Sequence, residues 1–187
     1  TFGATAETGF ALRDGQPVQW TVDPAGAVVL SELDVSAVRA VDPAPITEMR
    51  VSPDGVRVAL LVGGRVLLAA LSTNDRGVTS LTGVYRVSYG VDRAVVAIAW
   101  GGSAWIYLAR EGAEAPVMRI PLSGLPVSPL VAGNLKPPVA TMAASPTTVY
   151  VGDSRGVLSL RTVGTADQYW TSVDGADAGA VPVLPGS

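Results

Sequence analysis

The residue string with the most direct chemical meaning is Gly152-Asp153-Ser154-Arg155-Gly156, which fits the G-x-S-x-G pattern of a hydrolase nucleophile elbow. That chemistry needs the serine on a turn between a strand and a helix, and it needs a histidine to accept the serine proton. The string lies between two expected strands, and the chain contains no histidine. We therefore interpret it as a β-turn and expect no catalytic residues.

Two pairs of acidic residues are the next candidates for chemistry. Glu111 and Glu114 flank an expected hairpin loop, and Asp174 and Asp177 lie in a tail rich in glycine and alanine. Calcium binding or a shared proton would need several converging oxygens or a buried setting. The spacing does not match an EF-hand loop, and the chain contains no cysteine that could bind a metal. We expect solvated loop charges, with no metal and no cofactor.

The candidate binding residues are aromatic. Trp105 and Tyr107 share one face of an expected strand because side chains alternate with a period of two. Tyr169 and Trp170 are neighbours on another expected strand, so they point to opposite faces. Trp105 and Tyr107 would fill a seam between sheets if they belong to the core, which we favour, and would anchor a protein partner if they are exposed. Trp105, Tyr107, Tyr169 and Trp170 are thus our candidate partner-contact residues.

Charge excludes two classes of partner. Thirteen basic residues against 16 acidic residues give a formal net charge of −3 and a pI near 4.8, so we expect binding neither to nucleic acid nor to an anionic membrane surface. The arginines are scattered along the chain. A solvated polar rim is the simpler interpretation of them, and an anion-recognition groove is the alternative.

The elements that must position these residues are expected to be short β-strands. The chain has 187 residues, of which 48% are hydrophobic and 16% charged, and its 21 glycines and 14 prolines interrupt almost every segment long enough for a helix. This composition excludes a disordered chain and a coiled coil. Turns such as Pro53-Asp54-Gly55 and Gly63-Gly64 separate apolar runs that alternate or are rich in β-branched residues. We expect an all-β fold without long helices.

A repeat of about 46 residues organises these strands, which is the length of one four-stranded propeller blade. The segments Ile46–Ser72 and Val139–Val163 both read as three strands, and their Ser-Pro pairs begin at positions 52 and 145, 93 residues apart. Between them, Val95–Gly101 supplies the first strand of a middle copy, with later strands expected at 105–110, 116–122 and 129–133. The copy before it is expected to begin with a strand at 46–51. We expect Ile46, Val95 and Val139 to begin corresponding innermost strands of a β-propeller.

The chain therefore divides into about four blade-like repeats within one β-propeller domain, residues 1–187. The repeats are expected near 9–45, 46–93, 94–138 and 139–173, followed by a tail at 174–187. The first has three expected strands, at 9–13, 18–22 and 27–33, and no clear fourth. Closed rings have about 4–8 blades, so the chain is either a small four-bladed ring or the C-terminal portion of a larger one. We favour the larger ring, because the first repeat lacks a strand. The short apolar piece Val181–Leu184 is a candidate strand for closing that ring by pairing with an early strand.

The order of these motifs resembles one known family. The Ser-Pro-Asp-Gly turn, the Gly-Gly-Arg-Val-Leu-Leu hairpin, Val-Ala-Ile-Ala-Trp, and a terminus with Tyr169-Trp170 and Ala-Val-Pro-Val-Leu-Pro-Gly resemble the C-terminal propeller of the actinobacterial lipoprotein family LpqB. The resemblance implies a longer parent protein that is lipid-anchored on the outer face of the cell membrane and has a GerMN-type domain ahead of the propeller. The anchoring cysteine would belong to that parent, because this sequence has none.

The resemblance also implies a function. Proteins of this family act as accessory components that bind the extracytoplasmic part of the MtrB sensor kinase and modulate MtrA/MtrB two-component signalling in the cell envelope. Our first hypothesis is therefore a non-enzymatic extracytoplasmic protein-interaction domain. The alternative is a propeller enzyme or a binder of a small ligand, such as a sugar or lactone, with its site at the central channel and acidic residues converging on the axis. A third hypothesis is a spacer that orients the preceding domain.

Overall fold

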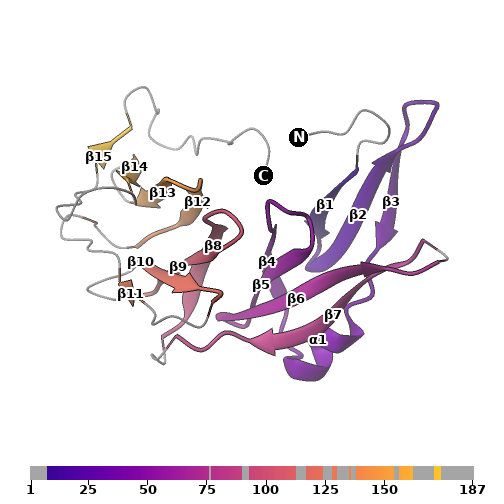
Figure 1. The fold of residues 1–187 in the computed structure, drawn as a ribbon, viewed down its shortest axis with the longest axis horizontal. Coiled ribbons are helices and arrows are strands. Elements are labelled where there is room, and N and C mark those ends of the chain that lie inside the picture. Colours follow the sequence, from indigo (N-terminus) through magenta and orange to yellow (C-terminus); the bar gives the residue numbers. More distant parts are fainter. Residues whose placement is uncertain are drawn as a thin grey trace. The chain divides into compact units, whose positions relative to one another are not determined.

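The computed structural model describes residues 8–75, 77–89, 93–112, 117–123, 128–129, 135, 138–153, 156–161 and 171–173. These residues form four antiparallel sheets and one short helix (Figure 1). They fall into two compact units, one holding β1–β7 and α1 and the other holding β8–β15. We describe each unit by itself.

The first unit contains two sheets whose strands follow one another in chain order. The first sheet has three strands in the described residues: β1 (Thr8–Arg13), β2 (Gln16–Val22) and β3 (Val28–Glu32). The second sheet has four: β4 (Ile46–Val51), β5 (Arg57–Val62), β6 (Arg65–Thr73) and β7 (Thr79–Arg86).

The second unit contains two four-stranded sheets of the same meander topology. The third sheet is built from β8 (Val95–Trp100), β9 (Trp105–Arg110), β10 (Val117–Pro121) and β11 (Ser128–Pro129). The fourth sheet is built from β12 (Thr141–Ala144), β13 (Thr148–Asp153), β14 (Gly156–Arg161) and β15 (Thr171–Ser172).

A serine organises the turn between the first two strands of the second sheet. The backbone N–H of Arg57 donates to Ser52 Oγ at 2.9 Å, and the N–H of Gly55 donates to the Ser52 carbonyl at 2.8 Å. Gly55 takes a φ of +73°, which a residue without a Cβ adopts without steric strain. Ser145 acts in a similar way in the fourth sheet, where the N–H of Thr148 donates to its Oγ at 3.1 Å. The two Ser-Pro motifs therefore form corresponding turns.

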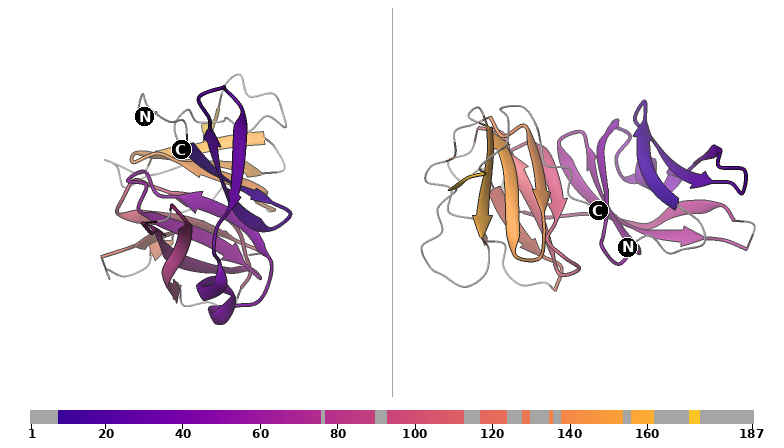
Figure 2. Two further views of the ribbon diagram at one scale, coloured as in Figure 1. Left: turned by 90° about the vertical axis from the view of Figure 1, so that its right-hand side faces the viewer. Right: turned by 90° about the horizontal axis from the view of Figure 1, so that it is seen from above.

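Each unit has its own apolar core between its two sheets. In the first unit, Phe10 and Leu12 of β1 pack against the face of the second sheet that carries Val58, Leu60 and Val62. In the second unit, the third and fourth sheets lie face to face (Figure 2), and their buried side chains form one cluster. The buried residues of this cluster are Ala97, Ala99, Tyr107, Ala109, Val117, Leu135, Val139, Met142, Val149 and Val151.

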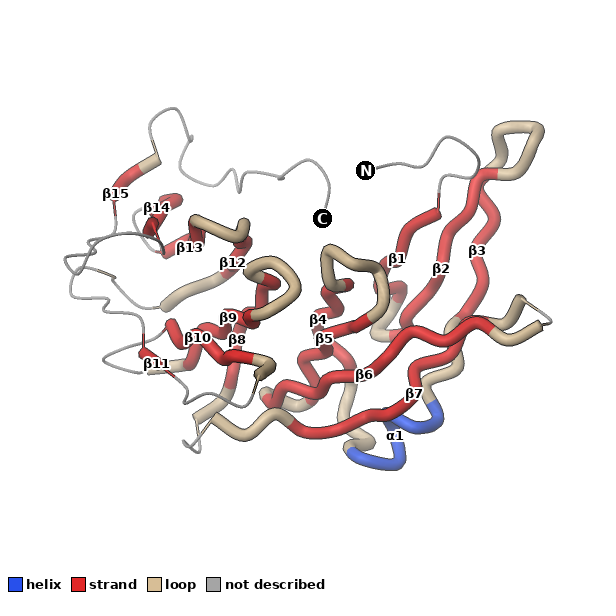
Figure 3. Tube along the Cα trace, in the orientation of Figure 1, coloured by secondary structure: helices blue, strands red, loops and turns tan. Residues whose placement is uncertain are grey.

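One short helix is present that the sequence analysis does not predict. Helix α1 (Ser36–Val41) follows β3 and lies beside β7 (Figure 3). Asp34 begins it by accepting a hydrogen bond from the Ser36 N–H at 2.9 Å, and Val38 is buried against the second sheet. Six residues are too few for a helical hydrophobic period to show in the sequence. Among the described residues, no helix has the length and hydrophobicity needed to cross a membrane.

The all-β class is confirmed, and several strand boundaries agree with those expected from the alternation. β4 and β9 have the expected bounds, and β8 begins at Val95 as expected. β12 begins at Thr141 rather than at Val139, which instead lies in the core just before the strand. The expected strand residues 130–133 and the tail segment Val181–Leu184 lie outside the described residues.

Candidate interaction surface

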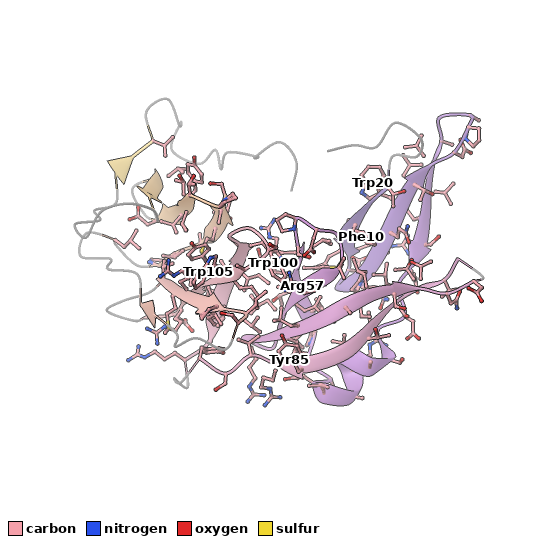
Figure 4. The ribbon with its side chains drawn as sticks, in the orientation of Figure 1. Phe10, Trp20, Arg57, Tyr85, Trp100 and Trp105 are labelled. Carbon is pink, nitrogen blue, oxygen red and sulfur yellow. The ribbon has the colours of Figure 1, made fainter. Side chains whose placement is uncertain are left out.

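The candidate interaction surface consists of a tryptophan and an arginine on neighbouring strands. Trp105 begins β9, and Arg119 lies in the middle of β10, opposite Tyr107. The Cζ atom of Arg119 lies 4.4 Å from the centroid of the Trp105 ring. Both side chains are half-buried, and Trp105 packs against the edge of the core between the third and fourth sheets (Figure 4).

This arrangement can bind without being reactive. A guanidinium over an indole face is held by the ring quadrupole, which contributes about 0.5–1 kcal/mol at exposed sites. The Nε atom of Arg119 is buried and has no hydrogen-bond partner among the described residues, so the ring is the contact that holds this end of the guanidinium. Tryptophan and arginine are also the residue types that dominate the binding energy of protein interfaces. The pair is thus held in a stacked arrangement, and part of each side chain remains exposed.

The four candidate partner-contact residues have different positions. Trp105 retains part of its surface, whereas Tyr107 is only 1% exposed and belongs to the core of the second unit. In this arrangement Tyr107 has no surface for a partner, and its ring fills the seam between two sheets, which is the interpretation that the sequence favours. Tyr169 and Trp170 lie outside the described residues.

The G-x-S-x-G string joins two antiparallel strands. Gly152 and Asp153 end β13, Gly156 begins β14, and Asp153 pairs with Gly156 across the hairpin. A nucleophile elbow instead connects a strand to a helix. The hairpin therefore agrees with a β-turn. Ser154 itself lies outside the described residues.

The acidic pairs show no converging arrangement in the part of the chain that the structure describes. Glu111 is exposed at the end of β9, while Glu114, Asp174 and Asp177 lie outside that part. No group of three or more histidine, cysteine, aspartate or glutamate residues that could hold a metal occurs among the described residues.

A buried acid that follows α1 lies between two arginines of the second sheet. Asp42 is 6% exposed, and its Oδ2 lies 3.4 Å from both Arg65 Nη1 and Arg86 Nη2. The N–H of Ala44 donates to its Oδ1 at 3.1 Å. This backbone hydrogen bond, together with the two guanidinium groups, lowers the pKa of Asp42 below its usual value. Because the carboxylate pairs with both arginines, the cluster holds β6, β7 and the segment after α1 together.

Arg119, which stacks on Trp105, and Asp42, which pairs with two arginines, are not among the partner-contact residues predicted from the sequence. Arg119 looks like any other scattered arginine, because its position over Trp105 depends on how β9 pairs with β10 across a six-residue connection. Asp42 looks like an ordinary loop acid. The only signal for Arg119 is the two-residue alternation in β10, which places it on the face of Val117 and therefore of the core.

Comparison with protein families agrees with this architecture. The family model of the lipoprotein LpqB β-propeller domain matches residues 1–185. The chain belongs to the LpqB β-propeller domain family. Its resemblance to that family, expected from the order of the sequence motifs, is confirmed, and so is the β-propeller fold class.

Curated LpqB relatives match most of the chain. The lipoprotein LpqB of Nocardia farcinica is 37% identical over 187 residues, which cover 95% of this chain and 31% of that protein. LpqB of Rhodococcus opacus is 38% identical over 163 residues, covering 86% and 27%, and LpqB of Mycobacterium leprae is 37% identical over 156 residues, covering 82% and 26%. The chain thus spans less than a third of the length of these LpqB relatives. Their description as lipoproteins places the LpqB family at the cell envelope.

Solved structures share the fold of this LpqB domain at low sequence identity. A functionally unknown protein from Desulfotomaculum acetoxidans superposes with a TM-score of 0.52 at 17% identity, covering 95% of this chain and 60% of that one. A protein from Lactobacillus plantarum gives a TM-score of 0.50 at 14% identity, covering 85% and 51%. These similarities concern the fold alone.

Proposed function

We propose that this LpqB propeller domain is a non-enzymatic, extracytoplasmic protein-interaction module, and that Trp105 and Arg119 form part of the surface that binds the partner. The observation that carries the proposal is the stacked pair itself, with Arg119 Cζ 4.4 Å from the Trp105 ring centroid. A side chain that is already ordered loses less conformational freedom when a partner binds. The absence of histidine and cysteine from the sequence supports a role in binding rather than in acid–base or thiol chemistry.

The proposed partner is the extracytoplasmic domain of a sensor histidine kinase of the MtrB type, with the parent protein anchored by a lipid to the outer face of the cell membrane. Binding would then modulate two-component signalling. This choice of partner is supported by the chain's membership of the LpqB family. The role itself is inferred from the resemblance of the sequence motifs to that family. The low net charge, −3 over 187 residues, is compatible with a protein partner and does not favour nucleic acid.

The test is a binding titration of the full-length protein against the isolated outer domain of the kinase. We expect micromolar or tighter binding, and a loss of affinity of about 10-fold or more for Trp105→Ala and Arg119→Ala, which is the range of interface hot spots. Tyr85→Ala is a matched control, since Tyr85 is an aromatic residue on β7 that is 55% exposed. Unfolding curves of each variant show whether a loss of binding arises from loss of the fold.

Two results would count against the proposal. Full-length protein that retains no kinase domain at micromolar concentration would exclude the proposed partner. If the Trp105→Ala and Arg119→Ala variants bound the kinase domain as tightly as the Tyr85→Ala control, the proposed surface would be excluded. The proposed partner would not be affected by that result. A stoichiometric metal ion in the purified protein would instead favour the ligand-binding alternative.

A further inference from the structure

The first sheet has three described strands, whereas each of the other three sheets has four. The strands of the first sheet can be matched to those of a four-stranded sheet through the turns that connect them. Turns of the same length and geometry identify corresponding pairs of strands. We therefore compare the two connections of the first sheet with those of the second sheet.

The β1–β2 turn matches the β5–β6 turn. Each has two residues between the strands, and both residues have positive φ: 53° and 77° for Asp14 and Gly15, against 54° and 75° for Gly63 and Gly64. This is the turn that suits a two-residue hairpin between right-twisted strands. The β4–β5 turn is different, since it is longer and has a positive φ at Gly55. β1 and β2 therefore correspond to β5 and β6, not to β4 and β5.

The β2–β3 connection matches the β6–β7 connection in the same way. The N–H of Asp23 donates to the Ala27 carbonyl at 2.9 Å, as the N–H of Asn74 donates to the Val78 carbonyl at 3.1 Å. The side-chain Oδ1 of Asp23 accepts from the Ala27 N–H at 2.8 Å, and Asn74 Oδ1 accepts from the Val78 N–H at 3.0 Å.

A glycine with positive φ also takes the fourth position of each of these connections. Its φ is 84° at Gly26 and 76° at Gly77, and its N–H donates at 2.9 Å to the carbonyl of the first residue of the connection in both cases. Both connections of the first sheet therefore agree. β3 corresponds to β7, the last strand of the second sheet, and the counterpart of β4 is the strand that the first sheet lacks among the residues that the structure describes.

The position of that strand is the free edge of β1. In an antiparallel ladder, successive residues direct their backbone groups alternately to the two neighbouring strands. Arg13 and Gln16 flank the β1–β2 turn and pair with each other, so Thr8, Phe10 and Leu12 direct their N–H and C=O groups away from β2.

The second sheet shows what these groups bind when the strand is present. By the turn correspondence, Thr8, Phe10 and Leu12 match Arg57, Ala59 and Leu61 of β5. The Arg57 carbonyl accepts from the Ser52 N–H at 2.8 Å at the end of β4, and Ala59 and Leu61 pair with Arg50 and Glu48 of that strand.

The low burial of β1 agrees with the lack of a neighbouring strand on that side among the described residues. β5, β9 and β13 are the second strands of their sheets; five of the six residues of β5 and of β9 are buried, and two of the six of β13. β1 has no buried residue among its six. An edge with unpaired N–H and C=O groups next to half-exposed apolar side chains is a template for a further strand.

We propose that the free edge of β1 binds an extended segment of the same, longer polypeptide, from outside these 187 residues, as an antiparallel strand that completes a four-stranded first sheet. The chain spans less than a third of the length of its LpqB relatives, so the longer protein has residues to supply the strand. The antiparallel direction follows from the pairing of β4 with β5.

The test is residue-resolved hydrogen–deuterium exchange on the full-length protein and on the 187-residue chain. The internal control is β3, whose outward-facing amides Val28 and Leu30 lie at the edge that corresponds to the outer strand β7 and should stay open. In the full-length protein we expect the amides of Phe10 and Leu12 to exchange about 100-fold or more slowly than those of Val28 and Leu30, because a paired strand exchanges only by opening. In the 187-residue chain all four amides should exchange rapidly.

Three results would overturn the proposal. Phe10 and Leu12 amides that exchange as fast as those of Val28 and Leu30 in the full-length protein would show that β1 remains an edge. Slow exchange of Val28 and Leu30 instead of Phe10 and Leu12 would place the added strand on β3. Slow exchange of the Phe10 and Leu12 amides in the isolated 187-residue chain would exclude a strand from outside that chain as the cause. If this slow exchange also depended on protein concentration, the occupant would be a second copy.

Discussion

The aromatic ring of Tyr107 lies against the α carbon of Gly101, so closely that a Cβ atom at position 101 would overlap Cε2 of the ring. Gly101 ends the β8 side of the hairpin and donates its N–H to the Trp105 carbonyl at 3.0 Å. Tyr107 is one of the largest fully buried side chains of the described residues. The absence of a side chain at Gly101 is therefore what allows this ring to enter the core between the third and fourth sheets.

Gly101→Ala should destabilise the domain by about 1–3 kcal/mol, because an added methyl group in a close-packed region forces the ring and backbone apart. Chemical denaturation monitored by tryptophan fluorescence measures the loss. The control is the same change in a Tyr107→Leu background, where the ring is absent. There the loss should be markedly smaller, and an equal loss in both backgrounds would contradict the contact.

Gly55→Ala should destabilise the domain by about 1 kcal/mol through the backbone alone. Gly55 has a φ of +73°, and a Cβ atom there would meet no atom within 4 Å. Gly55→Asn is the matched variant, because asparagine tolerates the left-handed conformation better than alanine does. Its loss should be the smaller of the two in the same denaturation experiment, and a larger loss for asparagine would contradict a purely conformational origin.

The turn at Gly55 illustrates what the sequence can predict. The residue types of Pro53-Asp54-Gly55 specify the turn locally, because proline restricts φ at its own position and glycine permits a positive φ. The flanking apolar alternation then determines which strands pair, and β4 and β9 have the expected bounds. Membership of an all-β, repeated fold follows from such local signals.

The candidate surface could be predicted only in part, because it depends on non-local pairing. Trp105 is found by its type and alternation, but Arg119 reaches it only through the register between β9 and β10. The same limit applies to Asp42, whose two arginines come from β6 and β7. Helix α1 escaped prediction because a single short turn has no period to detect.

Trp105 and Arg119 should be coupled by about 0.5–1 kcal/mol in a double-mutant cycle of unfolding free energies. Arg119→Met removes the charge and keeps much of the apolar stem, and Trp105→Leu removes the aromatic face and keeps an apolar side chain. The double variant should therefore be less destabilised than the two single losses added together. Additive losses would show that the stacked geometry contributes no interaction energy of its own.

Asp54 should make the stability of the domain depend on pH below about 4. A hydrogen bond from Ser52 Oγ, with further support from the Arg57 side chain and the Val56 N–H, lowers the pKa of Asp54 from 3.8 to about 2. Ser52 Oγ lies 2.5 Å, Arg57 Nη2 2.9 Å and the Val56 N–H 3.1 Å from the Asp54 carboxylate. Since the folded state favours the ionised carboxylate, its contribution to stability is fully present above the unfolded pKa. It is lost as the pH falls through the folded pKa.

The variant that tests this is Asp54→Asn, which keeps the size of the side chain but cannot ionise. Between pH 4 and pH 2, the unfolding free energy of the native sequence should fall more steeply than that of Asp54→Asn, while above pH 5 the difference between the two should be constant. Ser52→Ala removes the largest cause of the shift, so its pH dependence should lie between the two. Parallel pH profiles for all three proteins over this range would mean that the Ser52–Asp54 hydrogen bond does not favour the ionised form.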